Sequence, residues 1–474
     1  MGGGGHTGRV RIRSGVSAVL LLSVVTGLTA CTTAIAGSPT SSGSVVSHTD
    51  PNAPGGIDPS FVKNTDGGEI DRLAAAVLAD VKSYWSETFP KTFGGQWKDL
   101  TGGYYSVDTT DPNAPAPPCV DKATDVEGNA FYCPTADVMA WDRAALLPVL
   151  KERFGEAAVM LVLAHEMGHA VQRRAGLTIE QQRADPAKYP TILIEAQADC
   201  YAGSFVRWVA DDNATYLQIA TDRLDSALES LITFRDPIGT QQTDAGAHGD
   251  AFDRVSAFQD GFDSGAKLCA GMSMDNRTFT QTGFINAADA QSGGNLEFNQ
   301  MLNSITPKLN AYFSGLVTRR GGQWKEPSLS PTEARPNCTN ADQGPVAYCP
   351  DATKIDFDTK TELPGIHTKI GDYATGTLLA SRFAVAALTD LRKPTEGSNS
   401  QHDLVCLAGS FTGSLLNLDQ QYLSPGDLDE AIQVLLTYDY AARDIKGKFI
   451  PTGFERVRAF RKGVVDGDKS CGLD

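Results

Sequence analysis

The spacing of apolar residues predicts a long helix early in the chain and further helices around residue 160. From residue 70 onward, apolar side chains recur at helical spacing, at Ile70, Leu73, Val77, Val81, Tyr84 and Trp85. Residues 142–154 and 156–174 also predict helices, whereas Phe131 to Trp141 is typical of a strand. The Gly- and Pro-rich segments 94–98 and 111–118 predict a turn and a loop. We therefore expect an α+β fold that is mainly helical.

Two histidines lie four residues apart in the helix expected at 156–174. The segment reads His165-Glu166-Met167-Gly168-His169. Because positions four apart share one face of a helix, the two imidazoles can point at one metal ion. Glu166 is placed beside them to take a proton from a water that the metal activates. The alternative interpretation is a surface helix with two unrelated histidines.

A catalytic zinc site needs a third protein ligand, and a second acidic motif can supply it. Glu195 and Asp199 are four residues apart in the segment 194–203, so they share one face of the expected helix. A carboxylate on that face would complete a set of two His and one Glu. The other acid could accept the second ring N–H of a ligating histidine and fix its tautomer. A solvated acidic face is the alternative, but the surrounding Ala, Ile, Cys, Tyr and Phe residues argue against it.

These motifs together resemble the bacterial neutral zinc metallopeptidase family, a gluzincin-type group. The family pattern is HExxH followed by E-x-Q-A-D-C-x-A-G, which residues 165–169 and 195–203 match. Residues 129–142, ahead of the active helix, and residues 248–261, which begin His248-Gly249, are also similar to the family. The resemblance extends from about residue 68 to residue 272.

The resemblance implies a zincin-like catalytic domain at 67–272 that hydrolyses peptide bonds in peptides or proteins. By carry-over, one Zn²⁺ ion per chain is bound by His165, His169 and Glu195. Glu166 is then the general base, and Asp199 supports a ligating histidine from behind. We therefore expect a zinc-dependent metallopeptidase.

The first 30 residues resemble the signal peptide of a bacterial lipoprotein. Three arginines precede an apolar stretch at 16–30, which is too short for a confident membrane span. This stretch ends in Leu28-Thr29-Ala30-Cys31, which resembles a lipobox and implies cleavage before Cys31 and lipid attachment to it. Residues 31–66 are rich in Ser, Thr, Gly and Pro and predict a disordered tether. We expect a protein anchored by lipid at the extracytoplasmic face of the cell membrane; an ordinary secreted protein is the alternative.

The composition argues against a nucleic-acid partner. The chain has 474 residues and a formal net charge of −16, and no basic run stands out along it. This length is enough for two or three domains.

The second half of the chain repeats short motifs of the first half in the same order. The matching segments are 94–98 and 321–325, 131–134 and 347–350, 200–205 and 406–411, and 252–258 and 454–460. Repeats of this kind set the architecture of a chain. We therefore expect residues 295–474 to be a degenerate second copy of the fold at 67–272.

The cysteines indicate disulfide bonds within each copy. Nine cysteines are present, and setting Cys31 aside leaves eight, an even number that implies disulfides in an exported protein. Each copy carries four. Pairing within copies gives the hypothesis Cys119–Cys133, Cys200–Cys269, Cys338–Cys349 and Cys406–Cys471.

Alignment of the two copies separates structural residues from chemical ones. The aligned pairs are His165 with Ser381, Glu166 with Arg382, His169 with Val385, Glu195 with Gln401, Asp199 with Val405 and His248 with Ile450. Every candidate chemical residue is replaced, so nothing in the second copy can hold zinc in the same way. We expect this copy to be non-catalytic, and the replaced residues to be functional in the first copy.

His248 is a further catalytic candidate. It could stabilise the oxyanion of a tetrahedral intermediate, near Tyr201 or Arg254. A surface histidine beside a glycine turn is the alternative. Arg254 recurs as Arg456, which indicates a structural role for this arginine.

Two other functions stay open at this point. The protein could be a binding or assembly lipoprotein whose zinc is structural or vestigial, although the intact HExxH motif and third acid argue against this. It could also be a zinc hydrolase that cleaves a cell-wall amide bond, which the sequence does not distinguish from a peptidase.

Overall fold

The computed structural model describes residues 57–220, 223–244, 246–416 and 422–473. The expected signal peptide, Cys31 and the tether up to residue 56 lie outside these residues. The folded part begins earlier than expected, because Val62–Lys63 forms strand β1 and pairs in parallel with β2 (Gly103–Val107). The expected tether was therefore too long at its C-terminal end, because residues 62–63 already belong to the sheet.

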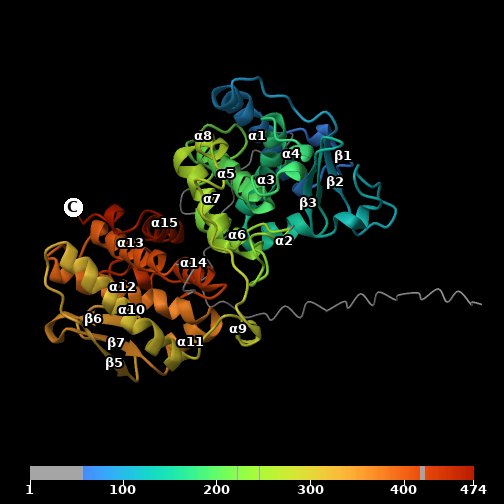
Figure 1. Cartoon of the computed structure of the whole chain (residues 1–474). Helices are drawn as coiled ribbons and strands as arrows, with labels where there is room; N and C mark the ends of the chain where they lie inside the picture. The colour runs from blue at the N-terminus through green and yellow to red at the C-terminus, as the bar shows by residue number, and fades with distance from the viewer. Residues whose placement is uncertain (1–56, 221–222, 245, 417–421, 474) are drawn as a thin grey trace, which may run out of the picture. The chain divides into compact units, whose positions relative to one another are not determined.

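The first sheet has four strands in the order β1-β2-β4-β3 (Figure 1). Strand β4 (Val138–Asp142) runs parallel to β2, and β3 (Ala130–Cys133) lies antiparallel to β4 at the edge. The single strand expected at 131–141 is thus a hairpin of two strands. The chain turns between them because Pro134 has no N–H to donate and Asp137 takes a left-handed φ of 53°.

Helices make up most of the first half. The long helix expected from Ile70 is α1 (Glu69–Phe93), and its periodic apolar residues are buried. The other helices are α2 (Leu146–Phe154), α3 (Glu156–Arg174), α4 (Ile179–Ala184), α5 (Thr191–Ala210), α6 (Leu224–Thr233), α7 (Ala251–Ser264) and α8 (Ala266–Ala270).

Helix α2 begins four residues later than the sequence predicted, at Leu146 instead of Asp142. Asp142 ends β4, and its buried carboxylate accepts hydrogen bonds from the backbone N–H groups of Ala144, Ala145 and Leu146. These bonds satisfy donors at the start of the helix, so Asp142 acts as a connector between strand and helix.

Glycines allow α5 and α7 to pack with their backbones in contact. A Cβ atom on Gly203 would lie 1.9 Å from the carbonyl oxygen of Phe258, and one on Gly261 would lie 1.8 Å from that of Cys200. Any larger residue would force the helices apart. This packing fixes α5, the helix that carries both acidic candidates.

The second half contains a similar series of elements. Its sheet has the order β5-β7-β6, from Ser328–Thr332, Lys354–Asp358 and Val346–Cys349, with β6 antiparallel to β7 as β3 is to β4. Its helices are α9 (Ala287–Ser292), α10 (Phe298–Arg319), α11 (Glu362–Lys369), α12 (Asp372–Asp390), α13 (Ser398–Ser414), α14 (Asp427–Thr437) and α15 (Gly453–Asp466).

The close helix contact also occurs in both halves. A Cβ on Gly409 of α13 would lie 1.9 Å from the carbonyl oxygen of Phe460, and one on Gly463 of α15 would lie 1.8 Å from that of Cys406. These values match those at Gly203 and Gly261. The shared sequence motifs therefore occupy equivalent packing positions.

Four disulfide bonds join the cysteines in the pairs expected from the sequence. They are Cys119–Cys133, Cys200–Cys269, Cys338–Cys349 and Cys406–Cys471. Each bridge lies within one half. The Cys200–Cys269 bridge ties α5 to α8, beside the helix contact at Gly261.

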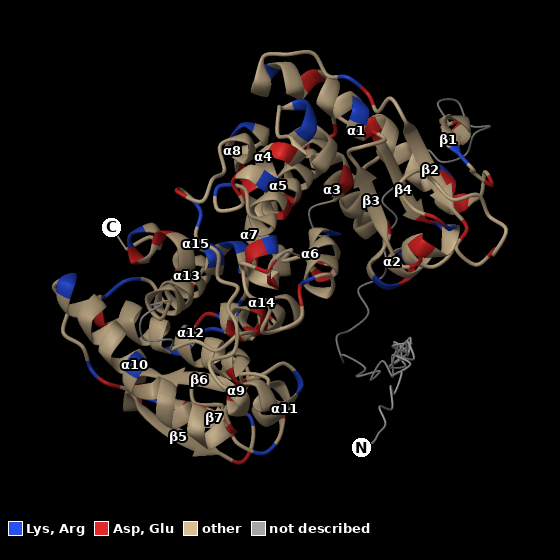
Figure 2. Ribbon diagram, turned by 45° about the vertical axis from the view of Figure 1, so that its right-hand side comes forward, with Lys and Arg blue, Asp and Glu red and all other residues tan. Residues whose placement is uncertain are grey.

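Acidic and basic residues alternate along the ribbon of the described part of the chain (Figure 2). Residues 57–473, apart from the gaps named above, include no helix of the length and apolar character that crossing a membrane requires.

We predict that Gly203→Ala destabilises the protein by about 1–3 kcal/mol or more, because the added methyl group overlaps the Phe258 carbonyl. Chemical denaturation followed by circular dichroism measures this change. Gly365→Ala in α11 is the control, because a Cβ there meets nothing within 4 Å and helix propensity favours alanine by up to about 1 kcal/mol. Equal stability of the two variants would contradict the packing argument.

Candidate metal centre

Helix α3 presents the HExxH residues on the side that faces α5. Its other face is buried in the core through Leu163, Met167 and Val171. The apolar positions thus fix the rotation of the helix, and His165, Glu166 and His169 line one cavity as a result.

A glycine brings α3 close to α5. A Cβ on Gly168 would lie 3.0 Å from the Cα atom of Ala198 and 3.1 Å from its carbonyl oxygen. These separations are tight for a side chain, so glycine permits the approach. The approach places Glu195 and Asp199, one helical turn apart on α5, against the two histidines.

The structure brings His165, His169 and Glu195 together. One ligand atom from each lies within 4.8 Å of the others. The Oε2 atom of Glu195 is 3.2 Å from Nε2 of His165 and 3.6 Å from Nε2 of His169. Tetrahedral ligands bound about 2.0–2.2 Å from zinc lie about 3.3–3.6 Å apart, so this donor set and its spacing fit the ion.

Asp199 orients His165 from behind. Its Oδ1 atom lies 2.7 Å from Nδ1 of His165, which leaves Nε2 directed toward Glu195. Asp199 is fully buried and is also paired with Arg254, whose Nε donates to Oδ2 at 2.9 Å and whose second nitrogen donates to Oδ1 at 3.0 Å. Burial alone would raise the pKa of Asp199, but the charges of Arg254 and then of His165 lower it below its ordinary value.

Gln172 orients His169 in a similar way, and the sequence analysis missed it. Its Oε1 atom lies 3.0 Å from Nδ1 of His169, and its Nε2 donates to the carbonyl of Ile194 and to Gln197. Gln197 in turn donates to the carbonyl of Cys269. The sequence did contain a signal for this contact, because residue 172 lies three positions after His169 and therefore on the same helix face.

The buried acids favour positive charge at this place. Burial would lower the pKa of His165, but Asp199 and then Glu195 raise it to about 10. A cation held between the imidazoles and Glu195 would meet the same favourable field. The electrostatics of the site therefore agree with its donor set.

Glu166 lies beside the candidate ligands and is held by the edge strand. Its Oε2 atom accepts a hydrogen bond of 2.9 Å from the backbone N–H of Tyr132 in β3. Burial raises the pKa of Glu166, against the opposing effect of His165 and His169. This bond restrains the Glu166 side chain, so its other carboxylate oxygen, Oε1, is also held in place.

Two cavities meet at the candidate ligands. One, of about 390 Å³, is lined by His165, Glu166, Phe131, His248 and Arg254, among others. The other, of about 920 Å³, is lined by Leu177, Ile179, Tyr189, Ile194 and Met274, among others. Both include Tyr132, His169 and Glu195, so a groove extends to either side of the site along the edge strand.

His248 lines the smaller cavity with Arg254, and its side chain is half exposed. Its Nδ1 atom is 3.4 Å from Oδ1 of Asp236. Of the two neighbours that the sequence offered, Arg254 lines the same cavity, whereas Tyr201 is buried in the core against Trp85. Arg254 has the structural role expected of it, since it also donates to the carbonyl of Phe234 at 2.7 Å.

The equivalent place in the second half is filled by Arg382. This buried guanidinium donates to Gln343 and to the carbonyl oxygens of Tyr440, Ala441 and Arg443. The nearby Gln401 donates to Asp444 instead of facing an imidazole. A guanidinium therefore occupies the position that Glu166 has in the first half.

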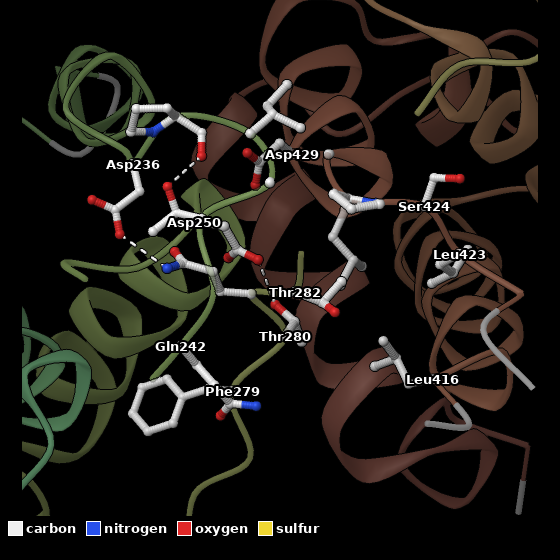
Figure 3. Close-up of a pocket in the computed structure, with 18 of the residues that line it drawn as sticks. Asp236, Gln242, Asp250, Phe279, Thr280, Thr282, Leu416, Leu423, Ser424 and Asp429 are labelled. Carbon is white, nitrogen blue, oxygen red and sulfur yellow. Dashed lines mark hydrogen bonds between the residues drawn. The ribbon is translucent and has the colours of Figure 1, made fainter. Parts of the chain in front are cut away.

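A separate pocket of about 150 Å³ is lined by residues of 236–282 and 415–429 (Figure 3). Its walls include Ile238, Phe279, Leu416 and Leu423, and Asp236, Asp250 and Asp429 lie along one side. These acids have structural partners: Asp250 caps α7 and Asp429 pairs with Arg235. None of the candidate ligands lines this pocket.

A match to a known protein family shows which family the chain belongs to. A family model described as "Putative neutral zinc metallopeptidase" matches residues 1–272, more than half of the 474 residues. The chain belongs to this family. Residues 273–474, which contain α9 to α15, lie outside the match.

Curated relatives of this family member include proteins of Escherichia coli and Mycobacterium tuberculosis. YpfJ of Escherichia coli K12 is 27% identical over 212 residues, which cover 42% of this chain and 69% of YpfJ. Rv2575 of Mycobacterium tuberculosis H37Rv is 32% identical over 156 residues, 29% of this chain and 53% of Rv2575. Both are uncharacterized proteins. No solved structure matches the chain.

We predict that Asp199→Asn weakens zinc binding by about 10- to 100-fold, because the amide cannot hold the His165 ring as the carboxylate does. Competition with a chromophoric chelator measures the affinity, and thermal unfolding of the same samples shows whether the variant is folded. Asp211→Asn, at the exposed end of the same helix, is the control and should bind zinc normally. Unchanged affinity in a folded Asp199→Asn protein would contradict the assignment.

Proposed function

We propose that this member of the zinc metallopeptidase family hydrolyses peptide bonds with one zinc ion bound by His165, His169 and Glu195. The observation that carries the proposal is the position of the Glu195 carboxylate, 3.2 and 3.6 Å from the two imidazole nitrogens. Two imidazoles and one carboxylate are a common donor set of catalytic zinc, and they leave a fourth position open. The orientation of both rings by Asp199 and Gln172 supports the same assignment.

A bound zinc ion would supply Lewis acidity, which polarises a substrate carbonyl and makes water a nucleophile near neutral pH. Glu166 then acts as general base. It takes one proton from the attacking water and delivers it to the amine that leaves when the C–N bond breaks. The hydrogen bond from Tyr132 N–H restrains one oxygen of Glu166 and leaves the other for proton transfer.

The edge strand supports an extended peptide as the substrate. Strand β3 is the last strand of its sheet, and Tyr132 within it lines both cavities. An extended chain can add to such an edge by main-chain hydrogen bonds while its side chains enter pockets on either side. A groove that continues past the site in both directions suits a substrate with residues on both sides of the cleaved bond.

His248 is suited to stabilise the oxyanion of the tetrahedral intermediate. It lines the cavity that contains Glu166, and its hydrogen bond with Asp236 raises its pKa above the ordinary value. A protonated imidazole on the cavity wall can donate to developing negative charge. This role is separate from metal binding.

The setting of the enzyme follows from the sequence motifs. The signal peptide and Cys31 support a lipid-anchored protein at the extracytoplasmic face of the cell membrane. The second half, with Arg382 in place of a base and Gln401 in place of an acid, is a degenerate non-catalytic copy that supports the first. The matching order of elements and glycine contacts favours this duplication.

We predict that Glu166→Gln retains zinc but loses hydrolysis of peptides by at least about a hundredfold, because the amide cannot accept the proton. Metal analysis of purified protein and cleavage of a peptide library measure the two properties. Glu152→Gln, an exposed position on the preceding helix α2, is the control and should remain active.

Two results would count against the proposal. Full activity of Glu166→Gln would remove the general-base mechanism. Absence of peptide cleavage by the zinc-loaded wild type, together with release of new amino groups from cell-wall fragments, would assign the site to a different amide substrate.

A further inference from the structure

We propose that Asp372, Asp427 and Glu430 form a calcium-binding site in the second half of the protein. The three residues are 5%, 6% and 5% exposed, so they are essentially buried. One carboxylate oxygen from each lies within 4.8 Å of the others. The cluster belongs to a region that the family match does not include, and it is independent of the proposed peptidase site.

The cluster lies where two helices begin. Asp372 is the first residue of α12, and Asp427 is the first residue of α14, whose first turn also carries Glu430. Glu430 reaches across to α12, where its Oε2 atom accepts from the N–H of Tyr373 at 2.8 Å. A Cβ on Gly371 would lie 1.9 Å from the carboxyl carbon of Glu430, so only glycine leaves room for this approach. The fold thus brings carboxylates of two helices into direct proximity.

One oxygen of the cluster has no partner. The Oδ1 atom of Asp372 is buried and accepts no hydrogen bond, while Oδ2 accepts from the N–H of Leu296 at 2.8 Å. An ionised carboxylate oxygen without a partner is costly in the interior, because it has lost its hydration. This unpartnered oxygen indicates that the site is completed by a ligand that the carboxylate can bind.

The negative charge of the cluster is not balanced by the protein. Within the described residues, none of the three carboxylates forms an ion pair with lysine or arginine, and His367 is a basic side chain that acts on Asp372. A helix start carries about half a positive charge, so two helix starts offset about one of three negative charges. Burial and the repulsion from Asp372 accordingly raise the pKa of Glu430 to about 8. A divalent cation would neutralise the remainder.

In the first half, a lysine neutralises the acid at the corresponding helix start. Glu156 begins α3 after Gly155 just as Asp372 begins α12 after Gly371, and the Nζ atom of Lys151 lies 3.7 Å from its carboxylate. The position of Lys151 corresponds to His367 in the second half. The acid at the start of α12 therefore lacks the lysine that neutralises its counterpart.

The donor set favours calcium over other divalent ions. All three ligands are carboxylates, which together offer up to about six oxygens, and calcium takes about 6–8 oxygens at about 2.3–2.6 Å. Two oxygens on one calcium ion can be up to about 5 Å apart, which accommodates the observed separation. Magnesium retains several waters, which a buried site does not accommodate readily, and zinc prefers nitrogen and sulfur ligands.

The test is a calcium titration of the zinc-loaded, full-length mature protein in calcium-free buffer, using CaCl₂ alone as the probe. We expect one additional site by calorimetry and a rise in Tm of about 2 °C or more at a hundredfold excess over Kd. Asp427→Asn and Glu430→Gln should each weaken calcium binding at least tenfold. Glu156→Gln is the matched control in the first half and should retain it.

The same variants also test the proposal through Tm in the absence of calcium, where they should stabilise the protein and not weaken it. Without calcium, Asp427→Asn should raise Tm because it removes a buried carboxyl whose ionisation is opposed by burial and by the neighbouring Asp372 and Glu430, and calcium should then add little. Three results would overturn the proposal: no calcium-dependent rise in the wild type, an undiminished rise in both variants, or an equal rise with MgCl₂ at the same concentration. Zinc content and peptide cleavage are measured in parallel, so failure of the peptidase assignment is seen separately.

Discussion

The structure of the candidate centre depends on one buried carboxylate, that of Asp199. It has no exposed surface, so its charge must be satisfied by protein groups, and the groups that do so are His165 on α3 and Arg254 on α7. Asp199 itself is on α5, so this one side chain links α3, α5 and α7. The glycines at 168, 203 and 261 allow the helix backbones to approach closely enough for these bonds to form. A loss of packing at the glycines is therefore also a loss of geometry at the candidate metal ligands.

The helices and the main candidate residues could be predicted from the sequence, because both follow from periodicity. The apolar spacing gave α1 and α3, and the four-residue spacings of His165 with His169 and of Glu195 with Asp199 gave the shared faces. The hairpin of β3 and β4 could not be predicted, since the turn depends on a left-handed φ at Asp137, which is uncommon for a residue other than glycine. Gln172 was missed because a glutamine in a helix usually faces solvent, although its spacing of three residues from His169 places both on one helix face. The start of α2 was misplaced because the capping bonds of Asp142 are made by a residue that also belongs to a strand.

The two halves use similar elements for different purposes. Both halves contain a sheet with an antiparallel edge strand. Both also contain two helices whose backbones are in contact at paired glycines. In the first half, the space between α3 and the edge strand is a groove lined by polar, titratable side chains. In the second half, that space is occupied by Arg382, and the buried acids are found instead at the starts of α12 and α14. The packing residues are thus shared, and the polar residues differ in both identity and location.

The hydrogen bonds of Arg382 would make it hard to build a metal site at the corresponding place in the second half. Putting histidines at positions 381 and 385 would not create a centre, because the guanidinium would still fill the space. Removing the guanidinium would take a hydrogen-bond donor away from the carbonyl oxygens of Tyr440, Ala441 and Arg443. A single substitution of this arginine is therefore expected to be destabilising, and several changes would have to occur together to make room for a metal. This space in the second half is thus committed to internal packing, which makes it resistant to the introduction of a ligand set.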